Sequence, residues 1–236
     1  MFRFDEYYLG YLGINSSNIM KNIIVVKSEY REMPLNGKYL YPIIFVEYNR
    51  YIVCSCSYEF FNICKDKFDG TIESIYSIFK VLNQNGNYYR LRKMRKYSID
   101  EITSIKYYTV ANTLTEDIIR SLSFNTNINI EDYIIRKKAI LLEKRQFVII
   151  KYNRIASTAF ISDIYNGGGN IVVFTNDDYK RHGYGKEVVK ACINWCVKNN
   201  IIPIYLVEES NSSSIKLAES LNLKLKSIEW VISISK

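Results

Sequence analysis

The segment from Phe174 to Val189, FTNDDYKRHGYGKEVV, constrains the fold more than any other part of the sequence. The apolar run at its start predicts a strand, and the apolar spacing at its end predicts a helix. Between them lies a basic loop that contains Gly183 and Gly185. The first turn of a helix offers unpaired N–H groups and the positive end of the helix dipole, and glycine lets an anion approach them closely. The segment therefore predicts a phosphate site at a strand-to-helix turn.

Positive charge around the loop supports this interpretation. Lys180, Arg181 and Lys186 flank the glycines, and the whole chain has 32 Lys and Arg against 24 Asp and Glu, a net charge of +8. A diphosphate is the anion that such a loop suits best. A second basic stretch, YRLRKMRKY, has five Lys and Arg residues between Arg90 and Lys96. It is compatible with a nucleic-acid surface, but isolated charge runs are usually solvated faces, and we favour a solvated face.

The second half of the chain has a regular alternation of helices and strands. The patterns predict, in chain order, a helix over 130–144, strands over 146–151, 155–164 and 170–175, a helix over 187–198, a strand over 201–207, a helix over 212–221 and a strand over 223–234. Gly167 to Gly169 are expected in a hairpin loop, and Pro203 suits an edge or the end of a strand. This order predicts an α/β protein with a mixed α+β sheet.

The first half predicts a smaller α/β domain without any specific motif. A strand is expected over 22–26, a hairpin over 41–57 and helices over 59–65 and 72–82. A polar, Asn-rich stretch begins at Ser121, so we place a domain boundary there. Residues 1–120 are then an N-terminal α/β domain of unknown role, and residues 121–236 are a second domain.

The glycine loop resembles the acetyl-CoA loop of the GCN5-related N-acetyltransferase (GNAT) family. That loop reads Q/R-x-x-G-x-G/A between a strand and a helix, and this sequence has Lys180-Arg181-His182-Gly183-Tyr184-Gly185. The glycines match, and Lys180 keeps the charge of the family's arginine without its planar fork. Two downstream motifs of the family, N-x-x-A/S and L-G-F, are similar to Asn211-Ser212-Ser213-Ser214 and Leu221-Asn222-Leu223. The resemblance covers residues 131–234, and the stretch 195–221 resembles a bacterial subgroup that has a separate N-terminal domain.

The resemblance implies a GNAT-type acyl-CoA N-acyltransferase fold in the C-terminal half, with acetyl-CoA as the cosubstrate. The backbone groups of Phe174 and Thr175 would pair with the pantetheine arm, and Asn211 and Ser214 would contact the pantetheine or adenosine side. The implied pyrophosphate loop consists of Lys180, Arg181, His182, Gly183, Tyr184, Gly185 and Lys186. The implied activity is acetyl transfer to a primary amine of a small molecule by direct attack in a ternary complex.

The acid and base of this reaction depart from the family's pattern. Relatives often carry a tyrosine in the last helix and a glutamate in the strand before the loop, where this chain has Ala218 and Asn170. Glu208, Glu209 and Tyr205, near the end of the following strand, are the substitute catalytic candidates. One alternative is a non-catalytic acyl-CoA-binding module. A nucleic-acid-binding protein ranks last, because no nucleic-acid fold signature accompanies the charge.

Cysteine and histidine usage argues against a metal. The chain has five cysteines without CxxC spacing and one histidine, His182, so we expect no metal, reduced thiols and core positions for Cys54 and Cys56. His182 belongs to the phosphate end of the loop rather than to the thioester end. No apolar run approaches the about 20 residues that a membrane-spanning helix needs, and no signal peptide is visible. We expect a cytoplasmic protein without a membrane partner, and a homodimer is one possible oligomeric state.

Overall fold

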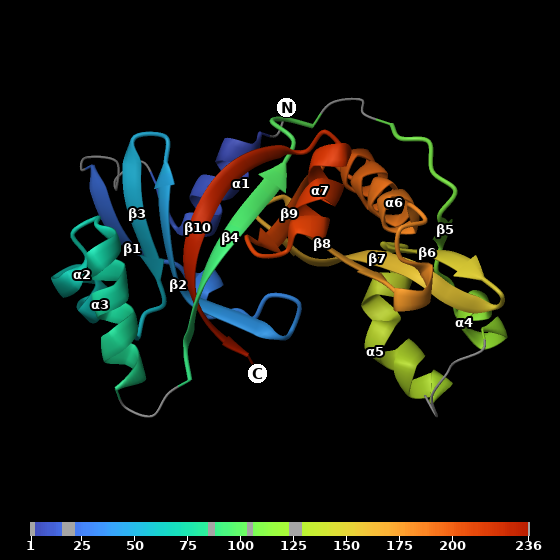
Figure 1. Cartoon of the computed structure of the whole chain (residues 1–236), viewed down its shortest axis with the longest axis horizontal. Helices are drawn as coiled ribbons and strands as arrows, with labels where there is room; N and C mark the ends of the chain where they lie inside the picture. Colours follow the sequence, from blue (N-terminus) through green and yellow to red (C-terminus); the bar gives the residue numbers. More distant parts are fainter. Residues whose placement is uncertain (1–2, 16–21, 85–87, 103–105, 123–128, 236) are drawn as a thin grey trace.

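The structure is a computed structural model that describes residues 3–15, 22–84, 88–102, 106–122 and 129–235 (Figure 1). Within these residues ten strands form one mixed sheet, in the order β1-β3-β2-β10-β4-β9-β8-β7-β6-β5. The strands are β1 (Ile23–Lys27), β2 (Tyr39–Tyr48), β3 (Tyr51–Cys56), β4 (Arg90–Ser98), β5 (Asn112–Thr113), β6 (Gln146–Lys151), β7 (Arg154–Tyr165), β8 (Gly168–Thr175), β9 (Ile202–Glu208) and β10 (Lys224–Ser235). The predicted α/β class with a mixed sheet is confirmed.

Helices pack at both ends and over the middle of this sheet (Figure 1). They are α1 (Phe4–Leu12), α2 (Phe61–Lys67), α3 (Ile72–Asn83), α4 (Glu116–Ser121), α5 (Ile130–Leu142), α6 (Tyr184–Lys198) and α7 (Ser212–Ser220). The helices α2 and α3 lie at the β1 end, whereas α6 packs on β6 to β9 and α7 packs on β9. Among the helices of the described ranges, none combines the length and the apolar character needed to cross a membrane.

The basic run forms β4, an interior strand that pairs antiparallel with β10 on one side and β9 on the other. The interpretation as a solvated face is wrong for Lys96, whose side chain is 1% exposed. Four of its cations face carboxylates on the neighbouring strands or the turn after β9; the ion pairs are Arg92–Glu208, Lys93–Glu209, Arg95–Glu209 and Lys96–Glu229. The run is compatible with an interior strand because these carboxylates offset its charge.

Strands from both predicted domains share the sheet. β4 comes from the first 120 residues, yet it lies between β9 and β10 from the second half. One core cluster also draws on both halves, from Phe4 in α1 to Val231 in β10. The boundary near residue 120 stays a prediction, and much of the stretch on which it was placed, 123–128, lies outside the described residues.

This arrangement corrects the prediction for the glycines and confirms the prediction that Pro203 lies at the end of a strand. Gly168 and Gly169 begin β8 instead of forming a loop. A Cβ on Gly168 would lie 2.3 Å from the ring of Tyr7, so glycine at this position lets α1 pack against the strand. Pro203 lies in β9, which is an interior strand, opposite Gly169. A proline is accommodated there because it is near the start of the strand, where the ladder with β8 covers only three residue pairs.

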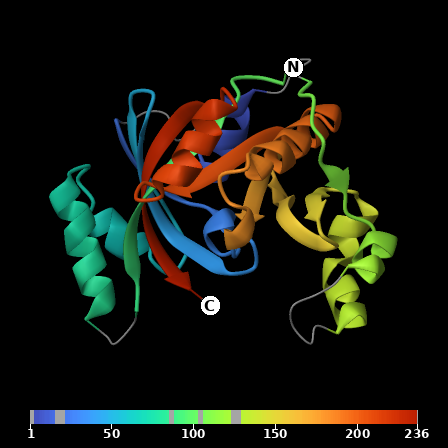
Figure 2. The same cartoon turned by 45° about the vertical axis from the view of Figure 1, so that its right-hand side comes forward.

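A segment from the first half holds α6 in place. The backbone N–H of Tyr107 donates to Asn194 Oδ1 at 2.8 Å, and Asn194 Nδ2 donates to the carbonyl of Tyr107 at 2.8 Å. The hydroxyl of Thr109 donates to the carbonyl of Glu187 at 2.7 Å. Residues 106–113 therefore run beside α6 before they reach β5 (Figures 1 and 2). These contacts fix the helix that follows the glycine loop.

A buried ion pair surrounded by tyrosines joins α1 to the middle of the sheet. Lys96 Nζ lies 2.9 Å from Glu229 Oε1, a charge contact without good hydrogen-bond geometry, and both side chains are at most 1% exposed. The hydroxyl of Tyr8 donates to the same Glu229 oxygen at 2.6 Å. The Lys96 ammonium also lies 4.0 Å from the centre of the Tyr11 ring, a cation–π distance. Part of the 21 tyrosines of the chain thus serves this core.

Removing the cation of this pair should destabilise the protein strongly. Lys96→Met is expected to lower the free energy of unfolding by about 3–5 kcal/mol, because the Glu229 carboxylate then stays buried without its cation. Urea unfolding followed by circular dichroism measures the loss. Lys93→Met on the same strand is the matched control; its ion pair with Glu209 is partly exposed, so its loss should be much smaller. Adding Glu229→Gln, which keeps an acceptor for Tyr8, should restore most of the stability, and no recovery would contradict this account.

Candidate functional site

The ladder between the parallel strands β8 and β9 ends early. Gly168, Gly169 and Asn170 pair with Ile202, Pro203 and Ile204, and the two strands separate beyond these pairs. β8 continues to Thr175 with its other edge bonded to β7, and β9 continues to Glu208 with its other edge bonded to β4. Backbone groups of β8 from Ile171 onwards therefore face a gap in the middle of the sheet.

A cavity of about 270 Å³ occupies this gap. One part of its lining comes from β8 and β9, including Asn170, Val173, Tyr205 and Glu208. The start of α7 contributes Asn211 and Ser214, so the cavity brings together four of the predicted site residues; they are Tyr205, Glu208, Asn211 and Ser214. A small ligand placed here would contact both separated strands and a helix N-terminus.

The glycine loop lies at the open end of the separated strands. Gly183 has the left-handed φ of +77°, and α6 begins at Tyr184, three residues before the predicted start. Gly185 is thus in the first turn of the helix. A Cβ on Gly185 would lie 3.2 Å from Thr175 Oγ1 and 3.7 Å from Leu217 Cδ2, so this glycine lets the end of β8, the start of α6 and α7 come together.

The charged side chains of the loop are exposed or partly exposed. Lys180 Nζ forms an ion pair with Asp177 at 2.5 Å. His182 folds back on the loop, with Nδ1 2.8 Å from the carbonyl oxygen of Lys180 and its ring stacked on Tyr184. With the unpaired N–H groups of the first helical turn, the loop has the features of an anion site. The roles of these residues stay predictions.

Tyr205 and Glu208 are the catalytic candidates that reach the cavity. Tyr205 is 2% exposed, and its hydroxyl lies 2.6 Å from Ser214 Oγ. Burial raises the pKa of Tyr205 above its ordinary value, so the phenol stays protonated at neutral pH. Glu208 accepts a hydrogen bond from Arg92 at 2.5 Å. Glu209 is not among the residues that line the cavity.

Glu209 is instead held by two cations of β4. Its carboxylate lies 3.0 Å from Lys93 Nζ and 3.0 Å from Arg95 Nη2. The hydrogen bonds from Lys93 and Arg95 lower the pKa of Glu209 below its ordinary value. Asn170, by contrast, lines the cavity, and Ala218 is fully buried.

The first half of the chain supplies a wall of the cavity whose residues the sequence did not predict. This wall, called the N-terminal wall below, consists of Leu35, Asn36, Tyr39, Tyr41, Arg92 and Met94. The guanidinium of Arg92 lies 5.5 Å from the centre of the Tyr39 ring, and the N–H of Asn36 donates to Asp163 Oδ2 at 2.8 Å. Arg92 and Met94 share one face of β4 because side chains alternate along a strand. That alternation was the one available signal in the sequence.

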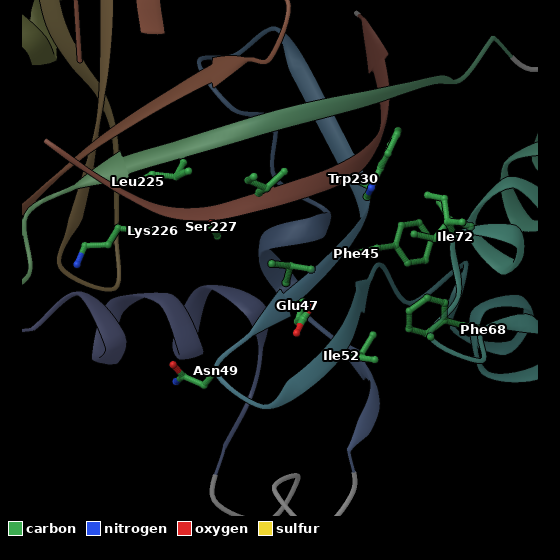
Figure 3. Close-up of a pocket in the computed structure, with 14 residues that line it drawn as sticks. Phe45, Glu47, Asn49, Ile52, Phe68, Ile72, Leu225, Lys226, Ser227 and Trp230 are labelled. Atoms are coloured by element: carbon green, nitrogen blue, oxygen red, sulfur yellow. The ribbon is translucent and has the colours of Figure 1, made fainter. Parts of the chain in front are cut away.

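A larger cavity, of about 580 Å³, lies elsewhere, between β2, β10 and α3 (Figure 3). Aromatic and aliphatic side chains such as Phe45, Phe68 and Trp230 line one part of it, and Glu47 and Lys226 lie at another. None of the predicted site residues lines this cavity. The smaller cavity remains the candidate site because it lies at a helix N-terminus and at the open edge of β8, the strand that leads into the glycine loop.

Comparison with known proteins identifies the family. The family model for GNAT acetyltransferases matches residues 47–228, most of the chain, and begins well before residue 131, where the sequence resemblance began. The chain belongs to the GNAT acetyltransferase family. The family uses acetyl-CoA.

The solved structures that resemble this chain do so at low sequence identity. A putative GNAT acetyltransferase from Novosphingobium aromaticivorans is 14% identical, with a TM-score of 0.45 over 62% of this chain and 66% of that one. A GNAT-like protein from Streptococcus suis is 14% identical, with a TM-score of 0.48 over 82% of both chains. The acetyltransferase yncA from Salmonella typhimurium, solved with acetyl-CoA, is 10% identical, with a TM-score of 0.42 over 53% of this chain and 92% of that one. The chain spans slightly less than two-thirds of the Novosphingobium protein, and no curated protein matches it significantly.

The loop geometry yields a test of acetyl-CoA binding. Gly183→Ala should weaken acetyl-CoA binding about tenfold, because a left-handed alanine is strained and its methyl group enters the open space above the first helical turn. Isothermal titration calorimetry measures the affinity. Gly37→Ala is the matched control, since Gly37 also has a positive φ, +63°, with no atom within 4 Å of the added Cβ. Equal affinities for the two variants would contradict the placement of the diphosphate at this loop.

Proposed function

We propose that the protein is an acetyl-CoA-dependent N-acetyltransferase that acetylates a primary amine of a small molecule by direct attack in a ternary complex. The observation that carries this proposal is the gap between β8 and β9, which holds a cavity beside the strand that leads into the glycine loop. Holding the two reactants aligned in such a gap can lower the activation free energy of the reaction by about 7–11 kcal/mol.

The cosubstrate would lie along β8. The backbone groups of Phe174 and Thr175 would bond its pantetheine arm as an added strand, and the N–H groups between Arg181 and Lys186 would hold its pyrophosphate. Phe174 is 65% exposed, which suits a position at the mouth of the gap. Asn211 and Ser214, at the start of α7, would contact the pantetheine on the opposite side.

The acceptor would enter against the N-terminal wall. A cavity of about 270 Å³ suits a small molecule rather than a protein segment. The rings of Tyr39 and Tyr41 can pack against the carbon skeleton of an amine, and the Glu208 carboxylate can attract its ammonium group. In this arrangement the first half of the chain completes the acceptor site, which fits the proposed membership of a bacterial subgroup with an added N-terminal part.

Two residues would move the protons. As the N–C bond forms and the C–S bond breaks, Glu208 takes a proton from the amine and Tyr205 gives a proton to the leaving sulfur. Tyr205 suits the acid role because burial keeps it protonated, and Ser214 orients its hydroxyl at 2.6 Å. Glu209 remains a predicted candidate, but Glu208 is favoured as the base because it lines the cavity and Glu209 does not.

The proposal also covers the cellular location of the protein and the redox state of its cysteines. All five cysteines are free. A reducing, cytoplasmic location would keep them so. The acceptor amine would then be a metabolite of that compartment.

The direct test measures CoA release with a panel of amines, amino acids and polyamines, together with calorimetric titration of acetyl-CoA. The proposal expects binding of acetyl-CoA and turnover of at least one small amine. Absence of acetyl-CoA binding at tens of micromolar would end the proposal. Tight binding without turnover on the whole panel would instead favour a non-catalytic acyl-CoA-binding module, for which the buried Ala218 is the supporting observation.

The proposed base can be tested with its neighbour as the control. Glu208→Gln should lower kcat about 100-fold, because the amide cannot accept the proton from the amine. Glu209→Gln removes a carboxylate one residue away, outside the cavity lining, and should change kcat little. Steady-state kinetics with the best amine give both values, and circular dichroism checks the fold. Equal losses for the two variants would exclude Glu208 as the specific base.

The proposed acid predicts a pH dependence. Because burial raises the pKa of Tyr205, loss of its proton should not limit kcat below about pH 10, the ordinary value of a phenol. Tyr205→Phe should lower kcat at every pH while acetyl-CoA still binds. The pH profile of kcat for the wild type and the variant tests this, and an alkaline fall near pH 8 that disappears in Tyr205→Phe would contradict it.

A further inference from the structure

Three cysteine side chains meet in the core between β3 and α2. Cys54 and Cys56 lie on the same face of β3, two residues apart, and Cys64 lies on α2. Their three sulfur atoms lie within 4.8 Å of one another, and all three residues are fully buried. We propose that Cys54, Cys56 and Cys64 bind one Cu(I) ion as three thiolate ligands, at a site separate from the acetyl-transfer cavity.

The spacing of the sulfur atoms suits a three-coordinate ion. Metal–sulfur bonds of about 2.3 Å place three sulfurs around a planar centre about 4.0 Å apart. The sulfur atoms of the cluster, at no more than 4.8 Å, would need to move by less than an ångström to reach that spacing. Rotation about χ1 of Cys64, the ligand from the helix, can supply such a movement.

The number and type of ligands favour Cu(I) over other thiophilic ions. Thiolates are soft ligands that prefer Cu(I), zinc and iron–sulfur clusters. Structural zinc and iron–sulfur sites take four protein ligands, whereas in the described part of the chain this group has three members, all cysteines. Three thiolates without a fourth donor are suited to a monovalent ion.

Two cations beside the cluster balance its charge. Three thiolates and one Cu(I) carry a net charge of −2. Lys27, on the adjacent strand β1, pairs in register with Cys56 of β3, and Arg31 follows in the turn whose Ser28 N–H donates to the carbonyl of Cys56 at 3.0 Å. Arg31 is fully buried, and its Nε and Nη1 have no hydrogen-bond partner among the described residues. An anionic metal site would give this buried cation the counter-charge that it needs.

The surroundings would protect the ion and also admit it. The cluster belongs to an apolar core that includes Phe45, Phe60 and Phe68, so bulk water is excluded. Phe45 and Phe68 also line the larger cavity, which brings open space up to the residues that enclose the sulfurs (Figure 3). In the proposal, the ion enters from this cavity by displacing these side chains.

Anaerobic titration of the reduced full-length protein with Cu(I), against a competing Cu(I) chelator, tests the proposal. The expected result is one Cu(I) retained per chain, with three sulfur neighbours at about 2.3 Å by X-ray absorption. Cu(I) should also raise the melting temperature of the wild type. Acetyl-CoA affinity and turnover are read separately, so failure of the proposed function would leave this result unaffected.

Two variants locate the ion. Cys64→Ala should lose Cu(I) to the chelator at least tenfold more readily than the wild type. The matched control is Cys192→Ala/Cys196→Ala, which removes the two buried cysteines of α6 and should retain Cu(I). If either variant fails to fold, the sulfur count in the wild type still decides. Release of copper from the wild type as easily as from Cys64→Ala, two sulfur neighbours instead of three, or preferential retention of four-coordinate zinc would overturn the proposal.

Discussion

The early end of the β8–β9 ladder is the constraint on which the site depends. An open strand edge inside a molecule leaves backbone N–H and C=O groups that need partners. Here the pairing stops after Asn170, and β8 extends five further residues with only its β7 edge bonded. A ligand with its own amide groups can bond this edge as an added strand, as the pantetheine arm would. The glycine loop follows β8 in the chain, so the predicted anion site comes directly after the open strand edge.

The strands on both sides of the gap are each held in place by residues that are distant in sequence. On one side β9 pairs with β4, whose basic side chains are matched by Glu208, Glu209 and Glu229. On the other side residues 106–113 hold α6, and α6 packs against β8. Both contacts come from the first half of the chain. The candidate site therefore depends on the whole sheet, and the Lys96–Glu229 ion pair joins β4 to β10 in its middle.

Local patterns predicted the parts of the site that are built from neighbouring residues. The loop from Lys180 to Gly185 could be predicted because a strand, glycines and a helix follow one another within a few residues. The N-terminal wall and the position of β4 in the sheet could not be predicted in this way. Both depend on strand pairing between residues more than 100 positions apart, and the run of Arg and Lys carries no local signal for such pairing. The packing of α1 depends likewise on Gly168, and the meeting of Cys64 with Cys54 and Cys56 depends on how α2 folds onto β3.

The crystal structure of the complex with acetyl-CoA tests the central claim most directly. The account predicts that the pantetheine arm lies between β8 and β9, bonded to the backbone of β8 from Ile171 to Thr175, with the diphosphate at Gly183 to Gly185. The acetyl group would then lie near Tyr205 and Glu208, facing the N-terminal wall. Acetyl-CoA bound in the larger cavity beside Phe45, or a complex in which β8 and β9 pair along their full length, would contradict it.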